Sequence, residues 1–231
     1  MLSKDPNREE DNSDTHSFFR LSDNKVHLLD LPDSKNSEYW GSPYGWLVIR
    51  SCYEQMRLFN PLSKVSVALP PLSSLEIYHP ELDMRKVVLA ISSTPTSLTT
   101  RLEDKFIVLI IFVGNYDIYF ARPGDRAWSA VERNPRAARM FEILNFDILY
   151  SNSQFYITTR SGEINCFDVS STNPVQTDFS DFISLRKNSD FYLVDISGEV
   201  HVVERVFKIF VGEYMGLESI SNPSFTLKKV S

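Results

Sequence analysis

The strongest constraint on the fold is a hairpin sequence that occurs twice, 36 residues apart. Residues 152–168 read NSQFYITTRSGEINCFD, and residues 188–204 read NSDFYLVDISGEVHVVE. The two segments align without a gap and are identical at seven positions, including the glycines Gly162 and Gly198. Each contains a run rich in β-branched and aromatic residues, a Ser-Gly pair and a second such run. This is the pattern of two strands joined by a tight turn.

A strand-rich unit that recurs at this spacing is typical of a β-propeller blade. We therefore predict an all-β fold, a β-propeller-like array of antiparallel blades that is incomplete and has about four or five recognisable blades. Two unrelated hairpins in a β-sandwich are the alternative. In either arrangement Gly162 and Gly198 are expected at equivalent turn positions, with a positive φ at one or both.

Turn signals divide the rest of the chain into short strands. They include Asp23-Asn24, Asn60-Pro61 and the tetrapeptide Arg122-Pro123-Gly124-Asp125, whose order of Pro and Gly suits a type II turn. Residues 106–113 are continuously apolar and predict a strand buried on both faces. Residues 135–144 are the one plausible helix, although an extended connector fits the blade spacing equally well.

The domain organisation predicted is an arm followed by one domain. Residues 1–17 are acidic and polar and are expected to be a disordered arm. Residues 18–231 form the propeller domain, with a partial last blade. Because such a blade leaves a strand edge exposed, we expect marginal stability and association.

Charge and cysteine content bear on partners and compartment. The net charge of −6 disfavours a nucleic-acid partner, and the apolar run at 106–113 is too short to span a membrane, so neither partner is expected. The two cysteines, Cys52 and Cys166, are expected to be free buried thiols in a reducing compartment. An intracellular location, in the cytoplasm, the nucleus or both, follows from this reading.

No motif in the sequence indicates chemistry. Phosphate-binding, dinucleotide-binding, zinc-protease and nucleophile-elbow patterns are all missing, and the four histidines have no partner at metal-ligand spacing. We therefore predict no catalytic residue, no cofactor, no metal and no enzymatic activity. His27 and His201 would approach each other only if the first and last hairpins met.

A series of short motifs identifies a family. In chain order they are Gly41-Ser42-Pro43-Tyr44-Gly45-Trp46-Leu47-Val48, Leu58-Phe59-Asn60-Pro61-Leu62, Leu69-Pro70-Pro71-Leu72, Arg85-Lys86-Val87-Val88-Leu89, Ala121-Arg122-Pro123-Gly124-Asp125 with Trp128, Asp147-Ile148 with Phe155-Tyr156, and Ser161-Gly162-Glu163. This series, over roughly residues 18–205, resembles the KIB-type β-propeller domain of a large plant family of F-box proteins, long classed as a domain of unknown function.

The resemblance implies the substrate-recognition part of an SCF-type E3 ubiquitin ligase. Members of the family usually carry a helical F-box that docks on the ligase adaptor, and residues 1–17 are too short and too polar to form one. The family's propeller also usually continues beyond the matched region, so truncation at both ends is expected. We therefore expect binding to a target protein of unknown identity and no binding to the adaptor.

Four residues and one loop are candidates for the protein-binding surface: Tyr39, Trp40, Arg122, Asp125 and residues 73–84. Trp40 is expected to be exposed, and the alternative for Arg122 and Asp125 is capping within their own turn. Trp46 and Trp128 lie in apolar runs and are expected to pack between blades. A sugar-binding or hydrolytic propeller and a degenerate copy without function are the alternative readings.

Overall fold

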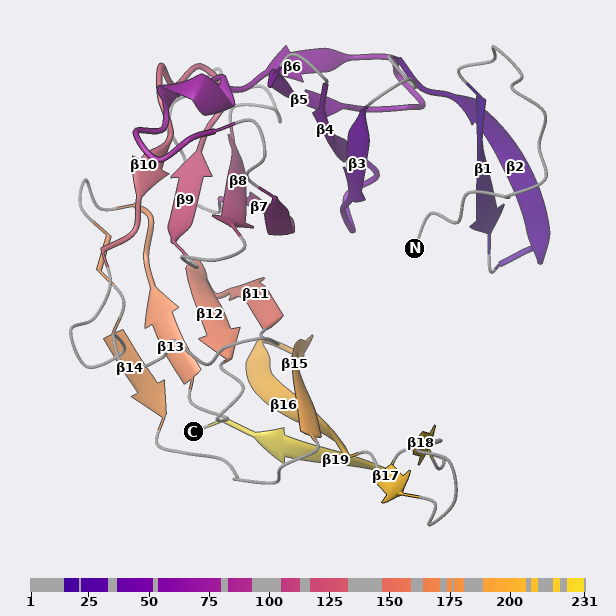
Figure 1. The fold of residues 1–231 in the computed structure, drawn as a ribbon, viewed down its shortest axis with the longest axis vertical. Helices are drawn as coiled ribbons and strands as arrows, with labels where there is room; N and C mark the ends of the chain where they lie inside the picture. The colour runs from indigo at the N-terminus through magenta and orange to yellow at the C-terminus, as the bar shows by residue number, and fades with distance from the viewer. Residues whose placement is uncertain are drawn as a thin grey trace. The chain divides into compact units, whose positions relative to one another are not determined.

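The fold is built almost entirely of antiparallel strands. In the computed structural model, the described strands pair into six separate sheets (Figure 1). The described residues contain no α-helix; a short 3-10 turn, η1 (Leu72–Ser74), precedes β7, and Lys105 also has 3-10 conformation. The structure describes residues 15–20, 22–32, 37–51, 54–79, 83–92, 105–112, 117–132, 147–158, 164–170, 174–175, 177–180, 189–206, 209–211, 218–220 and 224–230.

Three of the sheets are four-stranded meanders, in which each strand pairs with the strand that follows it. They are β3 (Glu38–Gly41), β4 (Leu47–Arg50), β5 (Met56–Phe59) and β6 (Ser66–Ala68); β7 (Met84–Ile91), β8 (Phe106–Phe112), β9 (Ile118–Ala121) and β10 (Ser129–Ala130); and β11 (Asp147–Ser151), β12 (Gln154–Thr158), β13 (Ile164–Phe167) and β14 (Thr177–Ser180).

The other sheets are smaller. They are the hairpin of β1 (Thr15–Arg20) and β2 (Lys25–Asp30), the three-stranded sheet of β15 (Ser189–Ile196), β16 (Glu199–Val206) and β19 (Ser224–Lys229), and the pair β17 (Ile209–Val211) and β18 (Glu218–Ile220). The predicted fold class, an all-β array of antiparallel propeller-type blades, is confirmed. The four sheets of three or four strands agree with the predicted number of blades.

Residues 1–91 and 95–129 form one compact unit, whose core lies between successive sheets. One face of the β3–β6 sheet, with Val48 and Leu58, packs against the β7–β10 sheet. Its other face, with Leu47 and Ile49, packs against Leu31 at the end of the first hairpin. The alternation of the two faces along β4 follows from the two-residue period of a strand.

The two tryptophans expected in the core are there. Trp46 is 4% exposed, and its ring meets that of Phe106 edge to face with 5.1 Å between centroids. Trp128 is 6% exposed and belongs to the same core. All seven residues of β8 are buried, so the strand predicted to be buried on both faces is confirmed over Phe106–Phe112.

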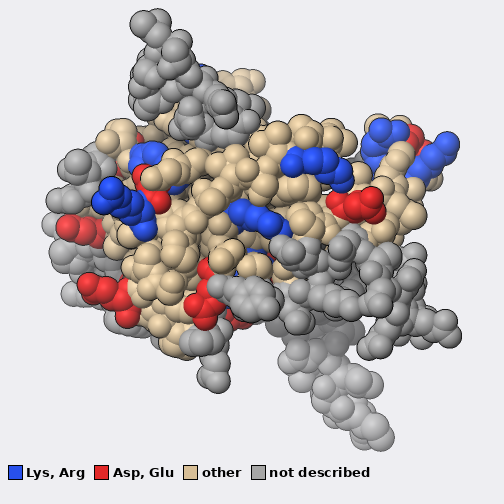
Figure 2. Space-filling view, turned by 90° about the horizontal axis from the view of Figure 1, so that it is seen from above, with Lys and Arg blue, Asp and Glu red and all other residues tan. Residues whose placement is uncertain are grey.

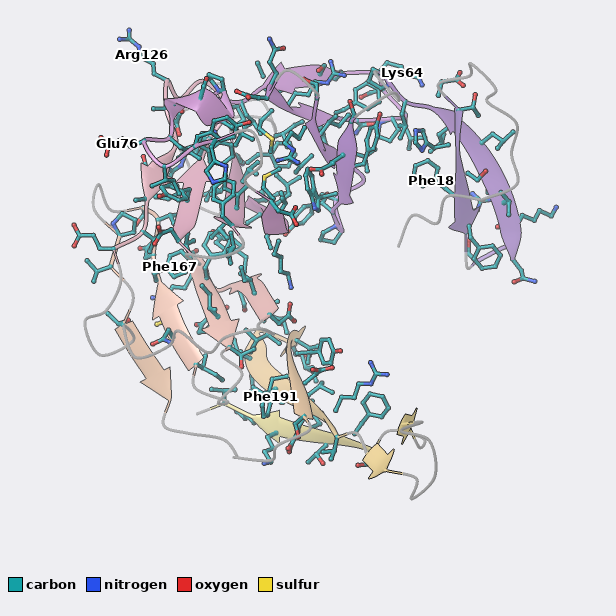
Figure 3. The ribbon with its side chains drawn as sticks, in the orientation of Figure 1. Phe18, Lys64, Glu76, Arg126, Phe167 and Phe191 are labelled. Carbon is teal, nitrogen blue, oxygen red and sulfur yellow. The ribbon has the colours of Figure 1, made fainter. Side chains whose placement is uncertain are left out.

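Residues 92–94 and 130–231 form the second compact unit. Here the β11–β14 sheet packs through Tyr156 and Ile164 against Phe191 and Val202 of the β15–β16–β19 sheet. Phe191 is labelled on this sheet in Figure 3. The free thiol of Cys166 is buried in this core, as expected, whereas Cys52 lies outside the described residues.

Both copies of the repeated segment form hairpins, but their registers differ by one residue. Phe155 lies opposite Phe167 in the first copy, whereas Phe191 lies opposite Glu204 in the second. An aligned register would have placed Phe191 opposite Val203. Because side chains alternate along a strand, this difference turns the second strand of one copy over relative to the other.

The turn of the second copy has the predicted conformation. Ile196 pairs with Glu199, which leaves Ser197 and Gly198 as a two-residue loop with φ of 56° and 82°. Two positive φ angles are those of a type I′ turn, the type that matches the twist of the flanking strands. The positive φ predicted for the glycine is thus confirmed at Gly198, and Gly162 lies outside the described residues.

Two further expectations concern segments that are partly or wholly outside the described residues. Strand β1 begins at Thr15, three residues before the boundary expected at residue 18, so the arm is at most residues 1–14. Whether that arm is disordered stays a prediction. The helix considered for residues 135–144 lies wholly outside the described residues.

Three side-chain hydrogen bonds join β11 and the turn after it to β15 and the β15–β16 turn. The Asp147 carboxylate accepts the Leu193 backbone N–H at 2.9 Å, and the Ser151 hydroxyl donates to Asp195. The Asn152 amide donates to the Gly198 carbonyl at 2.8 Å. These bonds fix the position of one sheet on the other within the second compact unit.

Replacement of Gly198 by Val should lower the free energy of unfolding by roughly 1 kcal/mol or more, since a β-branched residue is strained at φ 82°. Urea unfolding of both proteins measures the difference. Gly41→Val is the matched control, because Gly41 lies in a strand and a Cβ there would meet no atom within 4 Å. Equal losses in the two variants would contradict the turn assignment.

The Asp195 carboxylate should make stability depend on acid pH. The hydrogen bond from Ser151, and then that from the Gly198 N–H, lower its pKa below the ordinary 3.8. A lowered pKa stabilises the fold above the unfolded-state value, and this contribution is lost as the pH falls through the folded-state value. The stability difference between wild type and Asp195→Asn should therefore shrink below about pH 3.8, as urea unfolding at several pH values would show. A difference that grows on acidification would contradict this.

Candidate protein-interaction surface

The turn at Arg122–Asp125 is held by its own backbone and side chains. Gly124 has a φ of 88°, and the Asp125 N–H donates to the Arg122 carbonyl at 3.1 Å, which is type II geometry as predicted. The Asp125 carboxylate accepts the Arg122 N–H at 2.7 Å, and the Arg122 guanidinium lies 5.4 Å from the Phe120 ring centroid. Capping within the turn, the alternative considered for these two residues, is therefore what the structure shows.

Trp128, just after this turn, fixes the segment between β6 and β7. Its indole N–H donates to the Pro70 carbonyl at 2.9 Å, and its backbone N–H donates to the Ser74 hydroxyl at 3.3 Å. On the same segment Leu72 and Leu75 are buried in the core. The predicted 73–84 loop is thus anchored over its described part, and β7 begins at Met84.

We call residues 70–79 and 122–128 the loop pair, because Trp128 joins them. Figure 3 shows Glu76 and Arg126 pointing outward from these segments. The exposed residues of the loop pair are Pro71, Ser73, Glu76, His79, Gly124, Asp125, Arg126 and Ala127. The loop pair, held by Trp128, therefore exposes acidic and basic side chains next to small and polar residues.

Tyr39 and Trp40 do not belong to the loop pair. They lie on β3 with opposite orientations, and each is half-buried. The Tyr39 hydroxyl donates to the Pro32 carbonyl at 3.0 Å, and Trp40 packs against the core that contains Val48. The prediction that Trp40 is exposed is thus wrong, because both faces of the β3–β6 sheet, to which β3 belongs, are packed against other elements. A role of either residue in binding stays a prediction.

A polar cluster at the end of β4 was missed by the sequence reasoning. Arg50 pairs with Glu38 at 2.7 Å, and Tyr78 of the loop pair bonds to Glu54 in the β4–β5 turn. Burial, followed by the bond to Glu54, raises the pKa of Tyr78 to about 12, with Arg50 acting in the opposite direction. Tyr78 is therefore a neutral hydrogen-bond donor, and it ties the end of the loop pair to the β3–β6 sheet.

The loop between β5 and β6 presents one apolar side chain that the sequence reasoning did not select. The Asn60 carboxamide oxygen accepts the N–H groups of Leu62 and Ser63, each at 3.0 Å, and the Lys64 N–H donates to the Asn60 carbonyl at 2.8 Å. This loop leaves Leu62 83% exposed. The Asn-Pro-Leu motif was the available signal, since Asn and Pro specify the turn and leave the Leu at its tip.

Charged side chains of both signs are interspersed on the face shown in Figure 2. In the described part of the chain no three His, Cys, Asp or Glu side chains are grouped so that they could hold a metal ion. His27 bonds to Asp23 and His201 to the Glu199 carbonyl, each within its own hairpin. The described residues include no helix long and apolar enough to cross a membrane.

Comparison with known proteins decides the family. The model of the KIB1-4 β-propeller family matches residues 18–230. The chain belongs to this family. The sequence resemblance to KIB-type propellers is thus confirmed.

Two Arabidopsis thaliana proteins named as F-box proteins are similar to the chain. At5g55150 is 28% identical over 152 residues, which are 62% of this chain and 38% of that protein. At4g00893 is 28% identical over 151 residues, which are 63% of this chain and 34% of that protein. The chain thus matches little more than a third of the length of these two relatives.

Among solved structures, the chain is similar to the crystal structure of the Cps50 (Swd1) β-propeller domain of Myceliophteria thermophila. The TM-score is 0.42 and the identity 12%, with 92% of this chain and 68% of that chain covered.

Replacement of Trp128 by Phe should destabilise the KIB1-4 propeller by about 1–3 kcal/mol, because the buried Pro70 carbonyl loses its indole donor. Urea unfolding measures the loss, and protease cleavage within residues 70–79 should become faster. Arg126→Ala, at an exposed neighbouring residue, is the control and should change stability by less than about 0.5 kcal/mol. Unchanged cleavage in Trp128→Phe would show that the indole does not hold the loop pair.

Proposed function

We propose that this KIB1-4 propeller is the target-recognition part of an SCF-type E3 ubiquitin ligase receptor and that the loop pair contacts the target. Similarity to two F-box proteins supports the ligase context. The observation that carries the choice of surface is the Trp128 anchor, which holds two loops together and leaves their charged side chains exposed.

The chemistry of the loop pair suits protein recognition. Rigid loops lose little conformational entropy when they bind, so more of the contact energy remains as affinity. Arg126, Asp125 and Glu76 provide charges of both signs, which complement a target surface and exclude partners with the wrong pattern. In this role the protein binds its target and does not transform it.

The other candidate residues have one contact role and two supporting roles in the proposal. The exposed Leu62 supplies an apolar contact on a second rigid loop. Arg122 acts as a positioning residue, because its backbone holds the Asp125 carboxylate. Tyr39 and Trp40, as half-buried residues of β3, support the β3–β6 sheet, which residues 70–79 follow in the chain.

The loop pair can be tested by capture of targets from plant extract. The double variant Glu76→Lys/Arg126→Glu should recover the target at a level about tenfold lower or less, because it reverses two exposed charges and leaves the Asp125 cap of the turn in place. Proteins retained on wild type and on the variant are compared by quantitative mass spectrometry. Lys25→Glu, at an exposed position of β2, is the matched control and should retain the target. Equal recovery on all three proteins would refute the loop pair as the binding surface.

Adaptor binding is a separate test. The 231-residue chain should not retain a Skp-type adaptor, because an F-box is a helical domain and no described residue of this chain is α-helical. Co-precipitation of purified adaptor with this chain gives the answer, with an F-box-containing relative as positive control. Stoichiometric binding would reveal an adaptor surface on the propeller, without affecting the assignment of the loop pair.

A further inference from the structure

Strand β19 forms one edge of the three-stranded β15–β16–β19 sheet. It pairs with β16 along its whole length, from Ser224 opposite Val206 to Lys229 opposite His201. In the part of the chain that the structure describes, no strand pairs with the other edge of β19. All six of its residues are exposed.

The backbone hydrogen bond of Val230, just after β19, shows which residues of β19 bond to β16 and which face the open edge. The Val230 N–H donates to the Val200 carbonyl at 3.0 Å, so this pair is a hydrogen-bonded one. Because hydrogen-bonded and non-hydrogen-bonded pairs alternate, the backbone groups of Thr226 and Lys228 point toward β16. The N–H and C=O groups of Phe225, Leu227 and Lys229 consequently point away from it, toward the open edge.

We propose that this edge pairs with β19 of a second copy of the chain, antiparallel and centred on Leu227. The backbone groups that point outward belong to Phe225, Leu227 and Lys229, and these residues are spaced equally on either side of Leu227. A two-fold axis through Leu227 therefore places each outward N–H opposite an outward C=O of the second copy. In this register Leu227 lies opposite its counterpart, and Phe225 lies opposite Lys229 of the second copy.

The side chains fit the same register. On the face of the sheet that carries Leu227, the cross-strand row is Tyr192, Val203 and Leu227. Tyr192 is 38% exposed and Leu227 is 54% exposed. Pairing about Leu227 joins this apolar row to the same row of the second copy and extends it across a six-stranded sheet.

Lysines on an edge strand usually oppose such pairing, but here their charges are offset within the sheet. The ammonium of Lys229 pairs with the Glu199 carboxylate, and that of Lys228 lies 3.8 Å from Glu204 Oε2. In the proposed register each lysine faces an uncharged residue, since Lys228 lies opposite Thr226 and Lys229 opposite Phe225. No like charges are brought together, which favours a second copy as the occupant of this edge.

A proline substitution tests the backbone bonds. Leu227→Pro removes the one outward N–H at the centre and leaves the bonds to β16 in place, so it should fold normally and be monomeric. Leu227→Ala keeps that N–H and should remain dimeric. Size-exclusion chromatography with light scattering, at micromolar concentrations of the full chain, measures the mass of each protein. A monomeric wild type, or a dimer that Leu227→Pro does not weaken, would overturn the proposal.

Cross-linking tests the register without depending on that variant. Residues of a hydrogen-bonded antiparallel pair have Cα atoms roughly 5.5 Å apart, within the range of a disulfide. With Cys52 and Cys166 replaced by Ser, Leu227→Cys should form a disulfide-linked dimer on mild oxidation. Thr226→Cys, which would lie opposite Lys228, is the control and should link far less. Efficient linking through residue 226, or none through 227, would overturn the register.

Discussion

The burial of strand β8 on both faces is the constraint on which the first compact unit depends. A strand of seven consecutive buried residues exposes no polar face, so its sheet must be covered on both sides. The partner on one side is the β3–β6 sheet, which meets β8 through Trp46 and Phe106. That sheet in turn uses its second face to hold the first hairpin through Leu31. Successive sheets packed face to face are the direct consequence within this unit.

The loop pair is held by the same core. Trp128 contributes its ring to the core and its two N–H groups to the segment after β6, so the cohesion of the fold also positions the loop pair. Tyr78 secures the far end of that segment to Glu54. In the function proposed above, the exposed charges of such a surface can vary while the buried support stays unchanged.

The sequence was most informative where one residue type has a single structural explanation. Gly198 and Gly124 marked turns that need a positive φ, and the apolar run of β8 marked a doubly covered strand. It was least informative about contacts between segments far apart in the chain. The exposure of Trp40 was predicted wrongly because its polar neighbours do not reveal that β3 is covered on both faces. The Trp128 bond to Pro70 spans 58 residues and leaves no local pattern.

The register difference between the two repeated hairpins could not be read from their gapless alignment either, and it has consequences for the last sheet. The register of the second hairpin places Glu204 opposite Phe191, on the buried face of the sheet. Glu204 is therefore only 1% exposed. A buried carboxylate is costly unless it is paired and hydrogen-bonded, and Glu204 accepts the Ser189 hydroxyl at 2.9 Å.

A second contact of the Glu204 carboxylate comes from β19, where the Lys228 ammonium lies 3.8 Å from Glu204 Oε2. Lys228 can reach this carboxylate only if the even-numbered residues of β19 face the buried side of the sheet, with their backbone groups bonded to β16. The odd-numbered residues must then place their side chains on the opposite face and their N–H and C=O groups along the outer edge. The ion pair between Lys228 and the buried Glu204 thus requires one orientation of β19. That orientation determines which backbone groups and which apolar side chains of β19 are exposed to another molecule.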